Sequence, residues 1–474
     1  MINLEKLTIK KAQELIHDGE ISCRELVSIY QENIKKRNKD INAYLEVFND
    51  AFEIAEQEDK EILQGKELKP LTGIPLAVKN NILIEGKIAS AGSKILENYH
   101  AVYDATIIKK LRDAGAIFLG RTNMDEFAMG SSTENSAFGP TKNPYDLERV
   151  SGGSSGGSAA AIAMQGCLAA LGSDTGGSIR QPSSFCGVVG LKPTYGAVSR
   201  FGLIAMASSL DQIGPITKTI EDAEIIFNII KGKDSLDSTS VDVPHSTFPV
   251  PDKFKIGLLK YDRSGVDKKV NDAVDFSISV LRNLGHQVEE IELPHLEYSL
   301  PCYYIIQPAE TSANLARFDG VKYGLSVNGE NLLEDYMKTR AEGLGKEVKR
   351  RIILGTYVLS AGYYDEYYGR AQKVRALIRK DFKEAFESAS RRIDIILLPT
   401  APTPAFKIGE KIQDPLQMYL EDIFTVSVNL AGLPAISIPA PTPDLPIGIQ
   451  LIAPWFREDL LFELGKQYEK SPRS

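Results

Sequence analysis

The chain is 474 residues long, with 43% hydrophobic and 25% charged residues and a formal net charge of −8. This composition is typical of a soluble globular enzyme, and the length allows one large α/β domain or two to three ordinary domains. The acidic balance disfavours strong binding of nucleic acid, since phosphate contacts need clustered Lys and Arg. The sequence has neither a run of eighteen apolar residues nor a signal-peptide pattern, so we expect a cytoplasmic protein with no membrane contact.

The four cysteines predict reduced thiols. Cys23, Cys167, Cys186 and Cys302 are widely spaced and form no C-x-x-C pair, so neither a disulfide framework nor a metal site is indicated. Cys186 is a nominal candidate nucleophile, but a buried free thiol is the commoner fate of such a residue.

Apolar periodicity in the first part of the chain predicts helices that cover the outer surface. The pattern extends over Ser22 to Lys36 and over Ala43 to Lys60. Thr106 to Ala114 follow as a third helix, which Gly115 ends, and Ala116 to Gly120 form a buried strand. This alternation of helix and strand is typical of an α/β sheet.

The second half of the chain repeats the alternation. We expect a strand over Lys255 to Lys260, a helix from about Asp267 to Leu284 and a strand over Gln287 to Leu293. Ile393 to Leu398 is another apolar strand, stopped by Pro399. The proline-rich stretches 399–404 and 439–446 predict stiff surface connections.

The most informative stretch runs from Ser151 to Pro182, where two clusters of glycine and serine flank small apolar residues. The apolar residues between 159 and 168 predict a closely packed helix, which a flexible linker would not contain. Glycines at its ends free backbone N–H groups to point at a ligand. Such a loop could be structural, cradle a phosphate or be catalytic. The phosphate interpretation is weaker, because neither G-x-x-x-x-G-K-[ST] nor G-x-G-x-x-G occurs here.

These residues carry a family resemblance. Gly152 to Ser158, continued through Gly172 to Pro182, resembles the amidase signature over about thirty positions. Upstream, Leu71 to Asn80 is similar to the family's short strand that ends in a catalytic lysine. The resemblance implies a Ser-cisSer-Lys triad, with Ser178 as nucleophile, Ser154 as the bridging serine behind a cis peptide bond and Lys79 as the base.

The same resemblance implies a single α/β domain over residues 1–474, with a central mixed β-sheet covered by helices on both faces. Its N-terminal helices would occupy about 1–65, the signature core about 70–220, and the rest of the domain 221–474. Asp, Ser and Pro accumulate near Gly232 to Pro251, which is the best candidate boundary in the sequence. The resemblance runs across this segment, so we expect one domain.

Elementary chemistry supports a lysine base. A serine hydroxyl needs a base within hydrogen-bonding reach, and the five histidines all lie outside the glycine clusters. The G-x-S-x-G elbow of many Ser-His-Asp enzymes is also missing. A lysine can serve only when neutral, so burial must lower its pKa well below ~10.4. Lys79 follows the apolar segment Ile74 to Val78, which suits burial; the alternative is an exposed lysine at a strand end.

The family resemblance also implies an oxyanion site in the glycine-rich loop. The resemblance implies that backbone N–H groups of Thr175, Gly176, Gly177 and Ser178 hold the developing negative charge, and glycine permits the close approach that this requires. Asp174 and Arg180 are expected to fix the loop by hydrogen bonds rather than to react.

Segments outside the signature narrow the resemblance. Residues 124–131, 347–368, 422–425 and 429–434 look like the A subunits of glutamyl-tRNA(Gln) amidotransferases, and this similarity covers nearly the whole chain. Free glutamine is a zwitterion, so a selective pocket needs a cation for its α-carboxylate and an anion for its α-ammonium. The resemblance puts Arg351 and Asp422 in these roles, with Gly130, Ser131, Tyr303 and Tyr304 lining the site.

Alternatives remain open for these residues. Arg351 and Asp422 could be ordinary surface charges, and either Arg350 or Arg351 could face the pocket. Arginine suits a carboxylate because its planar fork can bond both oxygens. Tyr363, Tyr364, Tyr367 and Tyr368 recur at helical spacing, which indicates packing or an interface rather than catalysis.

The resemblance also implies partners. The chain would hydrolyse glutamine to glutamate and ammonia without a cofactor of its own, as part of a heterotrimer with B and C subunits. The B subunit would use ATP and magnesium to amidate misacylated Glu-tRNA(Gln), which binds mainly through that partner, and the C subunit would bridge the two. Whether Asp-tRNA(Asn) is also served stays open.

Three rival functions fit parts of the sequence. A stand-alone amidase for small or acyl amides would share Lys79, Ser154 and Ser178 but not the glutamine contacts. A non-catalytic assembly scaffold would keep the fold without the reaction, although all three triad positions are filled. A nucleotide-binding protein is the third alternative.

Overall fold

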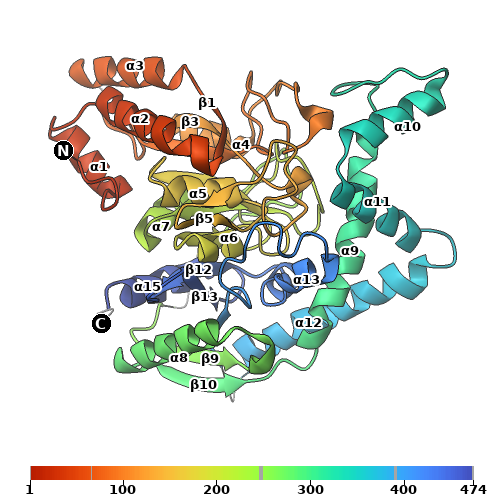
Figure 1. Cartoon of the computed structure of the whole chain (residues 1–474). Helices are drawn as coiled ribbons and strands as arrows, with labels where there is room; N and C mark the ends of the chain where they lie inside the picture. The colour runs from red at the N-terminus through yellow and green to blue at the C-terminus, as the bar shows by residue number, and fades with distance from the viewer. Residues whose placement is uncertain (1, 66, 245–248, 389–391, 472–474) are drawn as a thin grey trace.

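The computed structural model describes residues 2–65, 67–244, 249–388 and 392–471. One large mixed sheet runs through the molecule, and helices pack on both of its faces (Figure 1). This arrangement confirms the predicted α/β fold class. The strands are β1 (Tyr44–Val47), β2 (Pro75–Lys79), β3 (Ile117–Thr122), β4 (Lys142–Asn143), β5 (Asp146–Val150), β6 (Ala169–Asp174), β7 (Val189–Lys192), β8 (Gln212–Thr217), β9 (Lys255–Leu259), β10 (Gln287–Ile291), β11 (Ile395–Pro399), β12 (Ala435–Ala440) and β13 (Ile447–Ile452).

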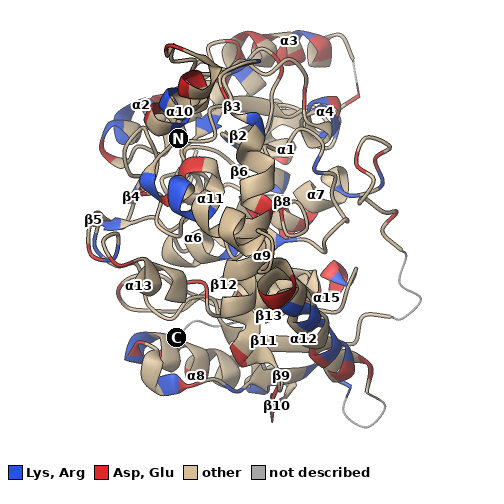
Figure 2. Ribbon diagram, turned by 90° about the vertical axis from the view of Figure 1, so that its right-hand side faces the viewer, with Lys and Arg blue, Asp and Glu red and all other residues tan. Residues whose placement is uncertain are grey.

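The strand order of the 11-stranded sheet is β1-β3-β2-β6-β8-β7-β12-β13-β11-β9-β10, while β4 and β5 form a separate hairpin. The pairs β2–β3, β2–β6, β9–β10 and β9–β11 are parallel, and the central pairs from β6 to β11 are antiparallel. Central strands such as β12 and β13 carry no charged residue and are buried, as expected for a sheet covered on both sides (Figure 2).

Helices cover both faces of the sheet, and further groups of helices lie outside these layers. Near one end lie the N-terminal helices, and a long arm of helices from α9 to α12 stands beside the sheet (Figure 1). The α-helices are α1 (Ile9–His17), α2 (Cys23–Ile41), α3 (Ala51–Leu63), α4 (Thr106–Asp113), α5 (Gly156–Ala163), α6 (Arg180–Phe185), α7 (Ile220–Ile230), α8 (Lys268–Asn283), α9 (Ser299–Asn314), α10 (Leu332–Gly343), α11 (Lys346–Val358), α12 (Arg370–Glu387), α13 (Pro415–Leu420), α14 (Val426–Ala431) and α15 (Glu458–Glu469).

Local sequence signals account for many of these boundaries. Ser22 caps α2 and exchanges hydrogen bonds with Glu25 in a capping box, and Asp267 caps α8. Gly115 has φ +94°, a left-handed conformation that ends α4 where the sequence predicted. The helix predicted from the apolar residues 159–168 is confirmed only in part, because α5 begins at Gly156 and ends at Ala163, and Leu168 directly precedes β6. Helix α5 packs closely against its neighbours: at Gly157 there is no room for a Cβ, which would clash with the Asn123 carbonyl oxygen.

Two predictions of local structure are wrong in part. The helix expected over 43–60 is interrupted, because residues 44–47 form the edge strand β1, paired antiparallel with β3, and α3 begins only at Ala51. Tertiary pairing with an available sheet edge overrides the helical spacing here. The proline-rich stretches are only partly surface connections. Pro399 ends β11 inside the sheet, Thr400 and Ala401 are buried, and Pro439 lies within β12.

The remaining strand and helix predictions of the second half are confirmed within a few residues, as β9, α8, β10 and β11. No helix in the described parts of the chain is long and apolar enough to cross a bilayer.

Candidate active site

Lys79 ends β2 and lies between β3 and β6, the two neighbours of that strand. Its side chain is fully buried, which decides against the exposed strand-end alternative. The apolar segment before it provides the reason, since a strand covered on both faces carries its last side chain into the protein interior.

Four oxygen atoms surround the Lys79 amine. Nζ lies 2.8 Å from Ser154 Oγ, 2.8 Å from Ser155 Oγ, 2.9 Å from Ser173 Oγ and 3.2 Å from the Ser173 carbonyl oxygen. An ammonium group can donate only three hydrogen bonds, whereas a neutral amine donates two and accepts one. The hydroxyl groups can therefore satisfy either protonation state, and a neutral amine can accept the Ser154 proton.

Electrostatics favour a neutral amine near physiological pH. Burial lowers the pKa of Lys79 to about 7, although the carboxylates of Asp125, Asp174 and Asp211 act in the opposite direction. A lysine with this pKa is about half deprotonated at neutral pH, which is the state a general base requires.

Ser154 and Ser178 lie on two loops that meet above Lys79. The Gly153–Ser154 peptide bond is cis, as the family resemblance implies. The Ser155 N–H donates to the Ser178 carbonyl oxygen at 3.1 Å, which ties the two loops together. Ser154 is fully buried, and Ser178 keeps 8% of its surface exposed. The serine that would attack a substrate is thus the more accessible of the two.

The loop that carries Ser178 is held by a buried ion pair. Arg180 donates to both carboxylate oxygens of Asp174, at 3.0 and 2.9 Å, and both side chains are fully buried. Burial alone would raise the pKa of Asp174, but the Arg180 guanidinium keeps it well below its usual range. The expectation that these residues fix the loop agrees with their contacts. Arg180 also reaches the Thr425 carbonyl and the side chains of Asn429 and Gln450.

The backbone of this loop presents N–H groups toward the space beside Ser178. The Gly177 N–H donates to Asp174 Oδ1 at 2.9 Å, so it is occupied. In the described residues the N–H groups of Thr175, Gly176 and Ser178 have no acceptor, so Gly177 is the member of the predicted oxyanion site that is already bonded. Positions 176 and 177 require glycine because their neighbours leave no room for a side chain. A Cβ at Gly176 would lie 2.6 Å from the Tyr303 hydroxyl oxygen, and one at Gly177 would clash with Thr425 Oγ1.

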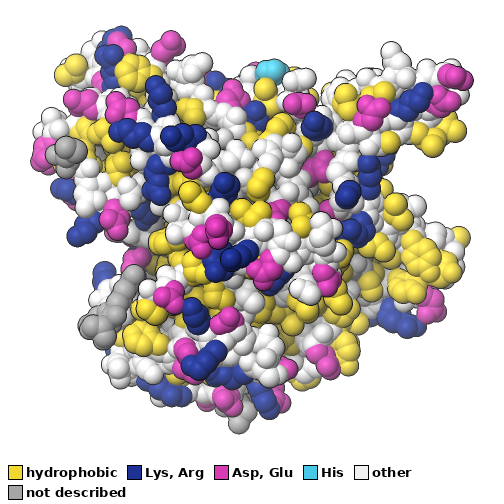
Figure 3. Space-filling view, viewed as in Figure 1, with side chains coloured by type: hydrophobic (Ala, Val, Ile, Leu, Met, Phe, Trp, Pro, Cys, Tyr) yellow, Lys and Arg dark blue, Asp and Glu magenta, His cyan; other side chains and the backbone are white. Residues whose placement is uncertain are grey.

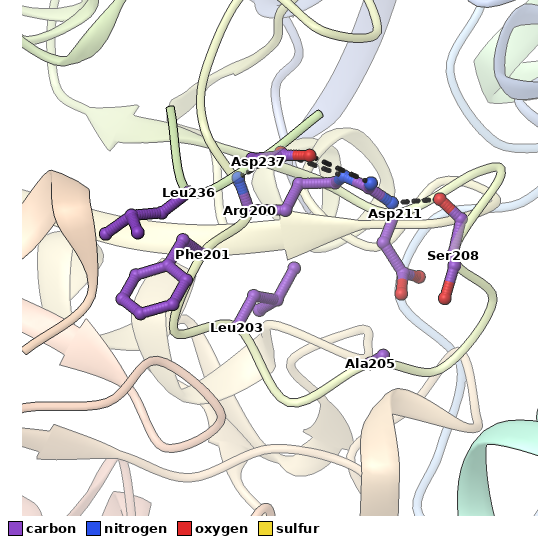
Figure 4. Close-up of a pocket in the computed structure, with 8 residues that line it drawn as sticks. All are labelled: Arg200, Phe201, Leu203, Ala205, Ser208, Asp211, Leu236 and Asp237. Atoms are coloured by element: carbon purple, nitrogen blue, oxygen red, sulfur yellow. Dashed lines mark hydrogen bonds and ion pairs between the residues drawn. The ribbon is translucent and has the colours of Figure 1, made fainter. Parts of the chain in front are cut away.

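Asp211 anchors the start of the same loop. Its carboxylate accepts the Thr175 hydroxyl at 2.6 Å and the N–H groups of Met206 and Ala207. Beside it lies a cavity of about 160 Å³, where Arg200 bonds Asp237 and the Ser208 carbonyl (Figure 4). The Asp211 carboxylate is therefore used to position the loop.

Arg351 lies on α11 and is buried, while the neighbouring Arg350 has 42% of its side chain exposed. The structure thus decides that Arg351 faces inward. Its Nε donates to Glu347 Oε1 at 2.7 Å and its Nη1 to Gln307 Oε1 at 2.8 Å. Its guanidinium carbon is 5.3 and 5.2 Å from the ring centroids of Tyr304 and Tyr419.

Asp422 provides the negative charge opposite Arg351. It accepts the Ser131 hydroxyl at 2.9 Å and the Tyr304 hydroxyl at 3.0 Å. Burial raises the pKa of Asp422 to about 7, and the two hydroxyl donors and Arg351 oppose this shift. Tyr304 contacts both charged groups, so the cation and the anion belong to one buried cluster rather than to the surface.

Gln181 links this pocket to the serine loops. Its Oε1 accepts the Gly153 N–H at 2.9 Å, and its Nε2 donates to the Ser131 carbonyl at 2.9 Å. Thr425, three residues after Asp422, donates to the Gly176 carbonyl at 2.5 Å. Gly130 lies against Asp125 at the turn before Ser131. The structure therefore brings all the sequence-predicted site residues into one connected region.

Sequence reasoning missed several members of this region, which are Ser155, Ser173, Gln181, Gln307, Glu347 and Tyr419. Glu347 could have been found, because Glu at i and Arg at i+4 form a pair on a helix. The others reach the site only through tertiary contacts. The tyrosines at 363–368 pack against one another on the surface, beside Tyr357, outside this region.

Comparison with known proteins shows the family. The amidase family model matches residues 25–462. The chain belongs to the amidase family. Among its amidase relatives, the A subunit of the glutamyl-tRNA(Gln) amidotransferase from Thermodesulfovibrio yellowstonii is 54% identical, with 99% of this chain and 98% of that protein covered. The A subunit of the Carboxydothermus hydrogenoformans enzyme is 53% identical over the same shares of both chains.

Solved amidase structures share the whole fold. The A subunit of the glutamyl-tRNA(Gln) amidotransferase from Thermotoga maritima superposes with a TM-score of 0.81 at 42% identity, covering 99% of this chain and 96% of that one. A 6-aminohexanoate cyclic dimer hydrolase reaches a TM-score of 0.83 at 27% identity, with 99% and 97% covered. Amidases with different substrates thus share this fold, so the substrate must be argued from the pocket.

Proposed function

We propose that this chain is the glutamine-hydrolysing A subunit of a glutamyl-tRNA(Gln) amidotransferase. The observation that carries the proposal is the buried pair of opposite charges, Arg351 and Asp422, joined through Tyr304 beside the Lys79–Ser154–Ser178 region. A zwitterionic amino acid needs both charges, whereas a simple amide needs neither. Relatives with the amidotransferase name cover the full chain at about half identity, which supports the same substrate.

The proposed reaction begins with neutral Lys79. Nζ takes a proton from Ser154 Oγ, which takes one from Ser178 Oγ, and Ser178 Oγ attacks the side-chain amide carbon of glutamine. The N–H groups of Gly176 and Ser178 stabilise the oxyanion. The proton on Lys79 returns through Ser154 to the leaving nitrogen, which departs as ammonia. Water then hydrolyses the glutamyl ester on Ser178 to glutamate by the same relay.

In this scheme, Arg351 binds the α-carboxylate and Asp422 the α-ammonium of glutamine. Glu347 and Gln307 occupy two donors of Arg351 and hold its plane, leaving other N–H groups for the substrate. Because each charged group is desolvated, each contact discriminates strongly against uncharged amides.

Partner proteins complete the proposed reaction. The B subunit would use ATP and Mg²⁺ to activate Glu-tRNA(Gln) and receive the ammonia, and the C subunit would bridge the two, in the cytoplasm where the tRNA resides. The acidic net charge of this chain agrees with a tRNA held mainly by its partner.

The test is ammonia release from glutamine by the full chain, alone and with B and C subunits, Glu-tRNA(Gln) and ATP. We expect partner-dependent glutaminase activity that Arg351→Ala reduces at least tenfold in kcat/KM. Arg350→Ala, the exposed neighbour, is the matched control and should leave activity unchanged. Cleavage of unrelated amides that responds neither to the partners nor to Arg351→Ala would instead establish a stand-alone amidase.

A further inference from the structure

A large groove lies on the side of the molecule that carries β9, the start of α9 and α13. Its volume is about 790 Å³, and apolar side chains supply much of its lining, among them Tyr261, Val266, Leu296, Leu300, Ile423 and Phe424. Hydrophobic side chains run across this lower half of the molecule in Figure 3, between the positions of α13 and α8 in Figure 1. The described chain leaves the groove open to solvent.

The rim of the groove extends this apolar surface. Leu416 and Leu420 are one turn apart on α13 and are 66% and 41% exposed, and Ile423 is 40% exposed. Exposing three large aliphatic side chains within eight residues to water is unfavourable in free energy. Contiguous exposed apolar surface of this kind marks a site where another molecule docks.

Charge indicates which kind of molecule fits. Two lysines at the groove are paired, Lys260 with Glu292 at 2.6 Å and Lys411 with Glu421. Two further carboxylates, Asp262 and Glu297, line the groove without a basic partner among its lining residues. The groove is therefore apolar with an acidic excess, which complements an aliphatic segment that carries Lys or Arg.

One wall of the groove is also a wall of the glutamine pocket. Glu421, Ile423 and Phe424 line the groove, whereas Asp422 and Thr425 point the other way, to Ser131, Tyr304 and Gly176. The segment is a series of tight turns, with the Thr425 N–H donating to the Asp422 carbonyl at 3.0 Å. A ligand that packs against Glu421, Ile423 and Phe424 therefore contacts the same short segment that positions Asp422 and Thr425.

We propose that this groove docks a partner protein through a segment with aliphatic side chains and at least one Lys or Arg, and that docking steadies Asp422 and Thr425 for glutamine hydrolysis. This inference rests on the proposed function, because it takes the partner to be a subunit of the amidotransferase. It adds where the partner binds and how its presence reaches the active site.

The experiment compares variants of the full chain for binding to purified B and C subunits and for glutaminase activity. Leu416→Glu and Leu296→Glu place a charge at the groove, and Glu297→Lys cancels its acidic excess. Leu63→Glu is the matched control, since Leu63 is 87% exposed at the end of α3, away from the groove. Leu416 is itself exposed, so its substitution leaves the core intact.

We expect the groove variants to weaken the partner Kd at least tenfold, to keep the basal glutaminase rate and to lose stimulation at subsaturating partner. Glu297→Lys should also lose the dependence of binding on salt concentration. Equal Kd values for the groove variants and Leu63→Glu would overturn the inference while leaving the proposed function in place. A wild-type chain that neither binds the partners nor releases ammonia from glutamine would overturn the proposed function itself.

Discussion

The signature core (residues about 70–220) and the arm of helices from α9 to α12 differ in how they hold their polar groups. In the core, Lys79, Ser154, Asp174 and Arg180 are fully buried and each polar group has a fixed partner. On the arm, α11 buries Arg351 on one face but leaves Ile353 68% exposed on another. The core thus holds the groups that must react. The arm adds side chains around them, which are Tyr303 and Tyr304 of α9 and Glu347 and Arg351 of α11.

The arm packs into the main hydrophobic core through Cys302, Tyr303 and Ile306 of α9 and through Ile378 and Phe382 of α12. Hydrogen bonds add to this packing. The Gly345 N–H at the start of α11 donates to the buried Glu126 at 2.8 Å, and Tyr419 reaches Glu347 at 2.8 Å. The core fixes the reacting atoms, whereas α11 of the arm holds Arg351, which we propose binds the substrate. Changes in the core should therefore affect turnover or stability, and changes in the arm should affect glutamine affinity.

The largest effect is expected for the core variant Ser178→Ala. Removing the nucleophile should lower kcat about 10⁴-fold, because no neighbouring group can form the glutamyl ester. Steady-state ammonia release measures the loss, and circular dichroism and glutamine binding should match the wild type. A Ser178→Ala enzyme that still turns over would refute the mechanism.

Asp174→Asn should lower the free energy of unfolding as well as the catalytic rate. It leaves Arg180 buried with an uncompensated charge, which costs about 3–5 kcal/mol of unfolding free energy. Denaturant titration measures this cost. Asp272→Asn removes the exposed pair with Lys268 and should leave the free energy of unfolding nearly unchanged, because water screens that pair. Similar effects for both variants would show that the core ion pair is not special.

Arg351→Lys tests the arm. Lysine keeps the charge but cannot bond a carboxylate with a planar fork, so KM for glutamine should rise about 100-fold with kcat much less affected. The measurement is glutaminase kinetics in the presence of the B and C subunits. A fall in kcat at unchanged KM would place Arg351 in the chemistry and contradict the division between core and arm.

The pH dependence separates the reacting lysine from the charge proposed to bind the substrate ammonium group. Burial lowers the pKa of Lys79 to about 7, so its neutral fraction and kcat should fall about tenfold between pH 8 and pH 6. Burial raises the pKa of Asp422 to about 7, so protonation below that pH should remove its charge and raise KM. In Asp422→Asn the KM dependence should disappear while the kcat dependence remains. A kcat that stays flat down to pH 6 would argue against a lysine base.

Glu347→Gln is expected to give the smallest effect. The amide can still accept the Arg351 Nε–H, but the charge that orients the guanidinium is lost, so KM should change only a few-fold. Glu347→Ala removes the acceptor as well and should raise KM further at unchanged kcat. If both variants behave like wild type, Glu347 does not position Arg351.

Sequence patterns predicted much of the fold and the core of the site. The unbroken signature located Lys79, Ser154 and Ser178, and apolar periodicity with capping signals located α2, α4 and α8. Such signals are local, since a cap, a turn glycine or a buried strand is written in adjacent residues. The edge strand β1 was missed because its pairing partner lies about 75 residues away in β3.

The sequence by itself determined which chemical groups this protein has for amide hydrolysis and the loops that carry them. Only the tertiary structure decided which of Arg350 and Arg351 faces the pocket, that Ser155 and Ser173 share the Lys79 amine, and that Glu347 and Gln307 hold Arg351. The physical reason is burial. The burial of a charge and its neighbours depend on segments that can be hundreds of residues apart in the sequence. Burial and neighbours together set the pKa of the charged group.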